Sequence, residues 1–162
     1  TDPVLANAYR NLQKHIEDSS YGSGLTFLNE YIEDADSRNA ALQKLVSNNA
    51  EIVFFDPDNG IEVASTNKKN IHKYVIWDEI MEAFESGKAV IVYQHFSRTN
   101  REAFIQSKVK EIQKRVSYPV VSMQVRHSVY FFLIQQKHEE KLRNAVKHFS
   151  ASWKHLAAVC NH

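Results

Sequence analysis

The chain has 162 residues, a formal net charge of +1, 43% hydrophobic and 24% charged residues, and one cysteine, Cys160. This length suffices for one domain with a core, and the charge excludes a global basic field, although a local basic patch remains open. A single cysteine excludes an internal disulfide framework, and no apolar run approaches the length of a membrane span. We therefore expect one cytoplasmic domain over residues 1–162 that does not enter a membrane.

The N-terminal third is predicted to hold two helices and one short strand. Residues 1–3, Thr-Asp-Pro, have the character of a helix start in mid-chain, which leaves open that an upstream segment is missing. Apolar spacing predicts a helix over residues 4–16. Aromatic residues and threonine favour a short strand over residues 25–32, although the leucine and isoleucine spacing there also fits a helix. Ser37 is expected to cap a helix that ends near residue 47.

The middle of the chain alternates strands and helices. Ile52–Phe55 is apolar without alternation, which is typical of a strand buried on both faces in a parallel sheet. Residues 74–86 are predicted to form a helix that Gly87 stops in a left-handed conformation. Residues 89–93 are predicted to form a second strand buried on both faces. A helix is then predicted over residues 99–116, with a capping box at its start.

The C-terminal part is predicted to form a hairpin and a last helix. Residues 119–125 and 129–134 read as strands, and their three-residue connection requires an antiparallel pair. A helix follows over residues 138–153. Because strands and helices alternate before the hairpin, the predicted fold is α/β, with an open, mainly parallel sheet, helices on both faces and a C-terminal antiparallel hairpin.

Polar side chains gather at the carboxyl ends of the first two of these strands. Ligands of open α/β sheets bind beyond such ends, and the two groups converge if the strands are neighbours. The candidate catalytic residues are Asp56, Pro57, Asp58, Asn59 and His95. The candidate substrate-binding residues are Tyr93, Gln94, Arg98 and Trp77.

Structural roles for the same residues stay open at this point. Asp56 and Asn59 are of the types that cap turns, His95 also fits a surface histidine bonded to backbone, and Tyr93 also fits the core. Gly60 is expected to need a positive φ whatever the function.

A metal site is an alternative interpretation of the acidic residues after the first strand. Asp56, Asp58 and Glu62 would hold Mg²⁺ or Mn²⁺, which prefer carboxylate oxygens. The pattern does not match a calcium loop, because its glycine comes one position early and no bidentate glutamate follows. The chain also lacks the HExxH and paired-cysteine spacings of zinc sites.

The turn Asp56-Pro57-Asp58-Asn59-Gly60 and the later Tyr93-Gln94-His95 resemble parts of a known family. They are similar to the second half of Rossmann-like S-adenosylmethionine-dependent methyltransferases, above all ribosomal-RNA adenine methyltransferases with a DPPY-type turn, and to uncharacterised bacterial proteins with DPDNG and YQH signatures. The resemblance implies that Asp56 and the Pro57 carbonyl bond the amine being methylated. Asp58 and Asn59 stand where that family has proline and an aromatic residue, and no glycine-rich cofactor turn is recognised.

Three functions follow as hypotheses. The first is a methyltransferase-like protein that uses S-adenosylmethionine and acts on nucleic acid. The second is a metal-dependent phosphodiesterase or nuclease with His95 as base. The third is a non-catalytic binding module on a degenerate enzyme fold, which the missing cofactor turn favours. A basic cluster in the sequence would serve nucleic acid, and it comprises Lys68, Lys69, Lys73, Arg98 and Arg101.

Overall fold

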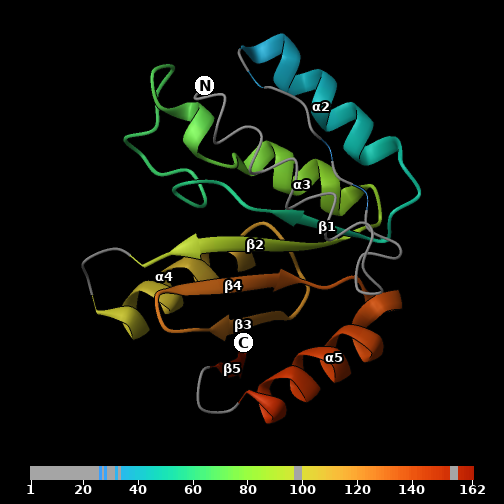
Figure 1. Ribbon diagram of the computed structural model, residues 1–162, viewed down its shortest axis with the longest axis vertical. Helices are drawn as coiled ribbons and strands as arrows, with labels where there is room; N and C mark the ends of the chain where they lie inside the picture. The colour runs from blue at the N-terminus through green and yellow to red at the C-terminus, as the bar shows by residue number, and fades with distance from the viewer. Residues whose placement is uncertain (1–25, 27, 29–31, 33, 97–99, 154–156) are drawn as a thin grey trace, which may run out of the picture.

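The computed structural model describes residues 26, 28, 32, 34–96, 100–153 and 157–162 (Figure 1). The helix predicted over residues 4–16 lies outside the described residues, as does most of the strand predicted over residues 25–32. Within the described part of the chain, no helix is both long enough and apolar enough to cross a membrane.

The described residues form an α/β fold around an open, five-stranded mixed sheet (Figure 1). In chain order its strands are β1 (Ile52–Phe55), β2 (Ala89–His95), β3 (Val120–Gln124), β4 (Ser128–Leu133) and β5 (Ala158–Asn161). Their order across the sheet is β1-β2-β4-β3-β5. The predicted antiparallel hairpin is confirmed as β3 and β4.

The prediction of a mainly parallel sheet is borne out only in part. Among the described strands, β1 and β2 pair in parallel, whereas β2–β4, β3–β4 and β3–β5 are antiparallel. The cause is the hairpin, which places β4 between β2 and β3. Since β2 and β3 run in the same direction, β4 must run against both of its neighbours. The pattern of the sequence identifies the hairpin but not its position in the sheet.

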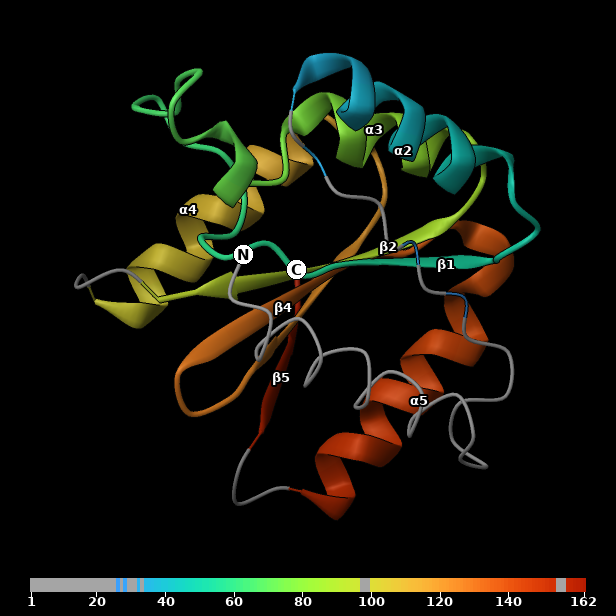
Figure 2. The ribbon, with the colours of Figure 1, turned by 45° about the horizontal axis from the view of Figure 1, so that its top comes forward.

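Helices cover both faces of this sheet, as the alternation of elements predicts. The helices before β3 lie on one face and the helix after β4 lies on the other (Figure 2). The first three are α2 (Ala35–Ser47), α3 (Trp77–Glu85) and α4 (Arg101–Gln113). The fourth is α5 (Glu139–Ser152), and the short 3-10 helices are η1 (Ile71–Lys73) and η2 (Gln136–His138).

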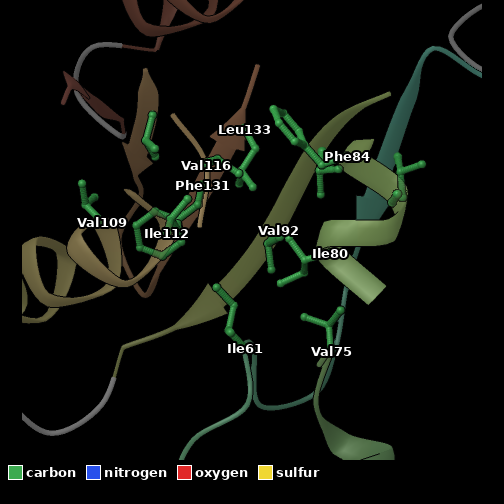
Figure 3. Packing of buried hydrophobic residues seen from close by; sticks show 14 of the residues in the cluster. Ile61, Val75, Ile80, Phe84, Val92, Val109, Ile112, Val116, Phe131 and Leu133 are labelled. Carbon is green, nitrogen blue, oxygen red and sulfur yellow. The ribbon is translucent and has the colours of Figure 1, made fainter. Parts of the chain in front are cut away.

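Two buried clusters hold these layers together. The larger one lies between the sheet and helices α3 and α4, with Ile80, Ile112 and Phe131 fully buried (Figure 3). The smaller one lies under α5 and includes Phe132 and Leu142. Successive residues of a strand point to opposite faces, so the neighbouring phenylalanines of β4 serve one cluster each.

Strand β1 departs from the prediction that it is buried on both faces. Val53 is 5% exposed, but Phe54 is 54% and Ile52 is 39% exposed. The α5 helix packs on the part of this face that β3 and β4 form, through Leu142 and Val146. None of the described elements therefore buries the Phe54 side chain on that face.

Several element boundaries differ from the predictions for local reasons. Asp34 caps α2, and Ser37 completes its capping box from the third helical position. The α3 helix begins at Trp77 instead of residue 74, because Val75 bridges to Ile61. Asn100 caps α4, which ends at Gln113 and not near residue 116. The pattern of the sequence does not predict the edge strand β5.

Candidate functional site

The polar ends of β1 and β2 lie side by side, as the sequence predicts for neighbouring strands. The parallel register pairs Phe55 with Val92, so Asp56 follows β1 at the level where Tyr93 follows on β2. Together with residues from β4, they line a pocket of about 450 Å³. Its lining comprises Phe54, Asp56, Pro57, Asp58, Tyr93, His95 and Tyr130.

Aromatic rings form the floor of this pocket on the α5 face of the sheet. The ring centroids of Tyr93 and Tyr130 are 5.4 Å apart in an edge contact, and those of Phe54 and Tyr130 are 6.3 Å apart. Tyr93 Oη lies 3.1 Å from His95 Nε2. These side chains come from alternate positions of three adjacent strands, so the pleat places them on one surface.

The electrostatics single out Asp56 among the acidic residues of the turn. Partial burial raises the pKa of its carboxyl group, the negative charge of Asp58 raises it further, and His95 offsets part of the effect. Burial also raises the pKa of the Tyr130 hydroxyl, with a smaller contribution from Tyr93. Desolvation disfavours the charged form of each group, so the Asp56 carboxylate has lost part of its water and is a receptive hydrogen-bond acceptor.

The Gln94 side chain holds the turn through hydrogen bonds to its backbone. Gln94 is 5% exposed, and its Oε1 accepts a 2.9 Å bond from the Ile61 amide while its Nε2 donates 3.1 Å to the Asn59 carbonyl. Gly60 lies between these contacts with φ +89°, and a Cβ there would stand 2.3 Å from the Gln94 amide. The glycine is therefore required both for its backbone conformation and for the close approach of Gln94.

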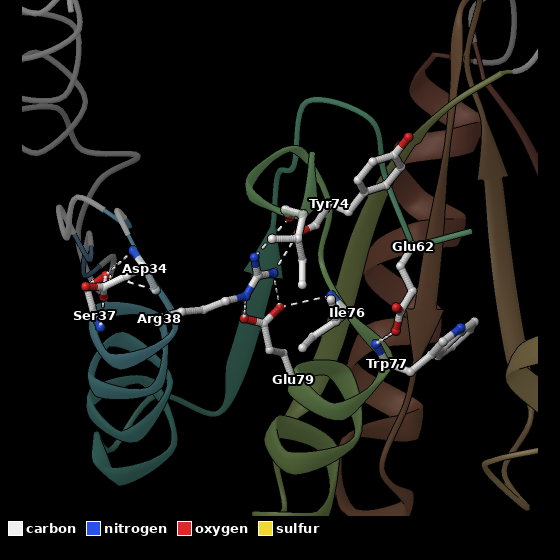
Figure 4. Close-up of polar contacts among 9 residues, drawn as sticks. Asp34, Ser37, Arg38, Glu62, Tyr74, Ile76, Trp77 and Glu79 are labelled. Atoms are coloured by element: carbon white, nitrogen blue, oxygen red, sulfur yellow. Dashed lines mark hydrogen bonds and ion pairs between the residues drawn. The ribbon is translucent and has the colours of Figure 1, made fainter. Parts of the chain in front are cut away.

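The outer side of the turn is held by the segment that leads into α3. The Asn59 amide donates 2.8 Å to the Lys73 carbonyl, and the Val75 amide donates 3.1 Å to the Gly60 carbonyl. Arg38 of α2 fixes this segment by donating to the Ile71 and Tyr74 carbonyls and by pairing with the buried Glu79 carboxylate at 2.5 Å (Figure 4). A chain of contacts thus runs from α2 to the pocket turn.

Comparison with known proteins gives no family assignment. No family model, no curated protein and no solved structure matches the chain. The site is therefore interpreted from its geometry.

The structure places five of the predicted site residues in the pocket. Asp56, Pro57, Asp58, Tyr93 and His95 line it. Asn59 and Gln94 instead hold the turn, because the Gln94 side chain bonds the Ile61 amide and the Asn59 carbonyl.

Two other predicted substrate contacts are not part of the described pocket. Trp77 packs against the core on the opposite face of the sheet, under the Arg115 guanidinium at 4.0 Å. Arg98 lies outside the described residues.

The three-carboxylate metal site expected from Asp56, Asp58 and Glu62 is not formed. Glu62 turns away and accepts a 2.6 Å bond from the Trp77 amide, where it caps the start of α3 (Figure 4). Among the residues that the structure describes, no three histidine, cysteine, aspartate or glutamate side chains are grouped to hold a metal ion. The error arises because sequence proximity after a strand does not say which side chains the turn directs inward.

Sequence reasoning missed two aromatic residues of the pocket. Phe54 stands two positions before Asp56, so strand alternation alone places both on one face. Tyr130 faces Tyr93 across the β2–β4 register, which the sequence does not reveal. Phe54 could therefore be predicted from the sequence, and Tyr130 could not.

Proposed function

We propose that this pocket binds a nucleobase that carries an exocyclic amine, and that the chain supplies the substrate-recognising part of a methyltransferase-like protein. The observation that carries the proposal is the geometry of the pocket, with the Asp56 carboxylate at the edge of a floor made by Phe54, Tyr93 and Tyr130. The ring faces accept a flat heterocycle, while the carboxylate accepts hydrogen bonds from its amine.

The chemistry of the pocket favours such an amine over other donors. An amine of adenine or cytosine offers N–H groups to the Asp56 carboxylate, and a hydrogen bond to a charged acceptor is stronger than one between neutral groups. The resemblance of the turn to the DPPY type implies the Pro57 carbonyl as a second acceptor. The exposed ring of Phe54 and the half-buried ring of Tyr130 supply the stacking surface that the changed residues Asp58 and Asn59 lack.

The arrangement of the sheet supports the same resemblance. A parallel pair, β1 and β2, is followed by an antiparallel hairpin whose second strand joins the sheet beside β2. We interpret these strands as the second half of a Rossmann-like sheet. Among the described strands β1 is an edge strand, so further parallel strands of such a sheet would pair there.

The described residues do not fit S-adenosylmethionine. Their two glycines are Gly60, which is committed to the pocket turn, and Gly87, which ends α3 at the amino-terminal end of β2. Neither belongs to a glycine-rich turn that could approach a cofactor closely. The described part of the chain therefore provides for recognition of the nucleobase and not for transfer of the methyl group.

The test is equilibrium binding of nucleosides to the 162-residue chain, followed by tyrosine fluorescence. Adenosine and cytidine should bind about tenfold more tightly than inosine and uridine, which lack the amine, since one charged hydrogen bond contributes roughly 1.5 kcal/mol. Asp56→Asn should abolish this preference. Asp78→Asn, which removes an exposed carboxylate at the start of α3, is the matched control and should preserve it. Equal binding of all four nucleosides would refute the proposal.

The poor fit to the cofactor favours a second candidate, a binding module that recognises the base without modifying it. The two differ in whether labelled methyl groups pass from S-adenosylmethionine to adenosine when this chain is supplied together with a cofactor-binding half of the same fold. Incorporation that Asp56→Asn abolishes would establish the enzyme. Base binding without incorporation would support the binding module.

A further inference from the structure

A second pocket, of about 350 Å³, lies at the turn of the β3–β4 hairpin. The hairpin residues 125–128 form one side of it, and Phe149, Trp153 and Ala157 form the other. Phe149 and Trp153 are 42% and 47% exposed, and their rings stack with centroids 6.1 Å apart and an angle of 24°. Arg126 and His127 are exposed on the rim.

This pocket continues the surface of the first one. Ser128 lines the second pocket and pairs across the sheet with His95, which lines the first. Tyr130, two positions further along β4, contributes to the floor of the first pocket and interacts with the Ser128 side chain. Alternate strand residues share a face, so both pockets open on the α5 face of the sheet.

We propose that the second pocket binds a further nucleotide of the strand that carries the recognised base, so that the two pockets together bind single-stranded nucleic acid. This inference rests on the function proposed above. The stacked pair of Phe149 and Trp153 offers a flat surface for a base of any identity, and Arg126 offers a charge for a backbone phosphate. An apolar peptide would use the rings but would gain nothing from the guanidinium.

The separation of the pockets fits a short segment of a single strand. Asp56 follows β1, and Val125 of the second pocket follows β3, which lies three strands away in the sheet. At about 4.8 Å per strand this is roughly 14 Å, or about four steps between bases at a stacked spacing of about 3.4 Å, so about five stacked nucleotides span it. Fewer nucleotides span it where the strand is extended. A mononucleotide reaches one pocket, whereas a tetranucleotide reaches both.

The test measures the affinity of the 162-residue chain for adenosine monophosphate and for oligodeoxyadenylates of two, four and six nucleotides, by competition with a labelled hexamer. The tetranucleotide should bind about tenfold more tightly than the monophosphate, and the hexamer only slightly more tightly than the tetranucleotide. Trp153→Ala should abolish this gain, because stacking on an aromatic ring typically changes affinity by about fivefold or more. Tyr118→Ala, an exposed aromatic residue remote from both pockets, should preserve it.

A second variant addresses the phosphate contact independently of the aromatic pair. Arg126→Ala should reduce the slope of log affinity against log salt by about 1, whereas Lys114→Ala at the end of α4 should leave the slope unchanged. The second pocket is not a subsite if neither Trp153→Ala nor Arg126→Ala alters the dependence of affinity on length or salt, while the monophosphate binds and Asp56→Asn weakens its binding. If Asp56→Asn has no effect at any length, the proposed function itself fails.

Discussion

Replacing Gly60 by alanine tests whether the pocket turn depends on the close approach of the Gln94 side chain to Gly60. The substitution forces a side chain into a backbone at φ +89° and places its Cβ 2.3 Å from the buried amide of Gln94. Gly87→Ala is a matched control, because its φ is +87° and the nearest heavy atom to its Cβ, Lys137 Nζ, is at an ordinary 3.6 Å. The two variants share the backbone strain and differ only in the clash.

The expected magnitudes follow from these contacts. The left-handed conformation costs an alanine roughly 1–2 kcal/mol at either position. At Gly60 the displaced Gln94 also leaves the Ile61 amide and the Asn59 carbonyl without their partner, which adds about 1–3 kcal/mol for the buried amide. Gly60→Ala should therefore lower the free energy of unfolding by about 2–5 kcal/mol, against about 1–2 kcal/mol for Gly87→Ala.

Urea denaturation followed by circular dichroism measures both values. The double variant Gly60→Ala, Gln94→Ala should be less destabilised than the sum of the two single variants, because the second substitution removes the clash. Gly60→Ala should also weaken adenosine binding, whereas Gly87→Ala should not. Equal destabilisation by Gly60→Ala and Gly87→Ala would refute the role assigned to Gln94.

Three further predictions concern charged groups around the site. Asp56→Asn should raise the Tm at pH 7 by about 1 °C, because the substitution removes a partly desolvated charge that solvent still screens. Because the pKa of Asp56 is raised in the folded protein, this rise in Tm should be full above the folded pKa and should disappear as the pH falls below the ordinary value of 3.8. A rise in Tm that grows on acidification would contradict the raised pKa. Arg38→Met should lower the free energy of unfolding by about 3–5 kcal/mol in urea titrations, because it leaves the Glu79 carboxylate buried without its ion-pair partner. The double variant Arg38→Met, Glu79→Gln should recover part of this lost stability. Glu62→Ala should lower the free energy of unfolding by about 1 kcal/mol, because the hydrogen bond to the Trp77 amide is lost, and it should not change nucleoside affinity. A change in affinity would show that Glu62 takes part in ligand binding.

The sequence predicts the elements of this fold better than their arrangement. The strands β1 and β2, the hairpin and the helices α2 to α5 follow from apolar spacing and turn chemistry, both of which are local. The insertion of β4 beside β2 depends on pairing between residues about 40 positions apart, and nothing in either strand alone specifies it. The edge strand β5 is short and mostly exposed, so it carries no apolar pattern to read.

The candidate site was predictable to the same extent. Asp56 and His95 could be placed together because parallel neighbours end at the same edge of a sheet. The roles of Gln94 and Glu62 could not, because both side chains turn inward to satisfy buried or helix-terminal amides. Polar residues after a strand thus include those that build the turn as well as those that face a ligand, and only the path of the backbone separates them.

The position of β4 has a consequence for the order in which the protein is completed during synthesis. β1 and β2 leave the ribosome well before residues 128–133, yet β2 lacks its second neighbour until β4 arrives. In that interval β2 presents an open hydrogen-bonding edge of apolar residues, which is a template for wrong association. The β3–β4 hairpin is local and forms quickly, so its docking protects the edge and adds Tyr130 to the pocket in a single event. Completion of the pocket therefore coincides with the pairing of β2 with its second neighbour.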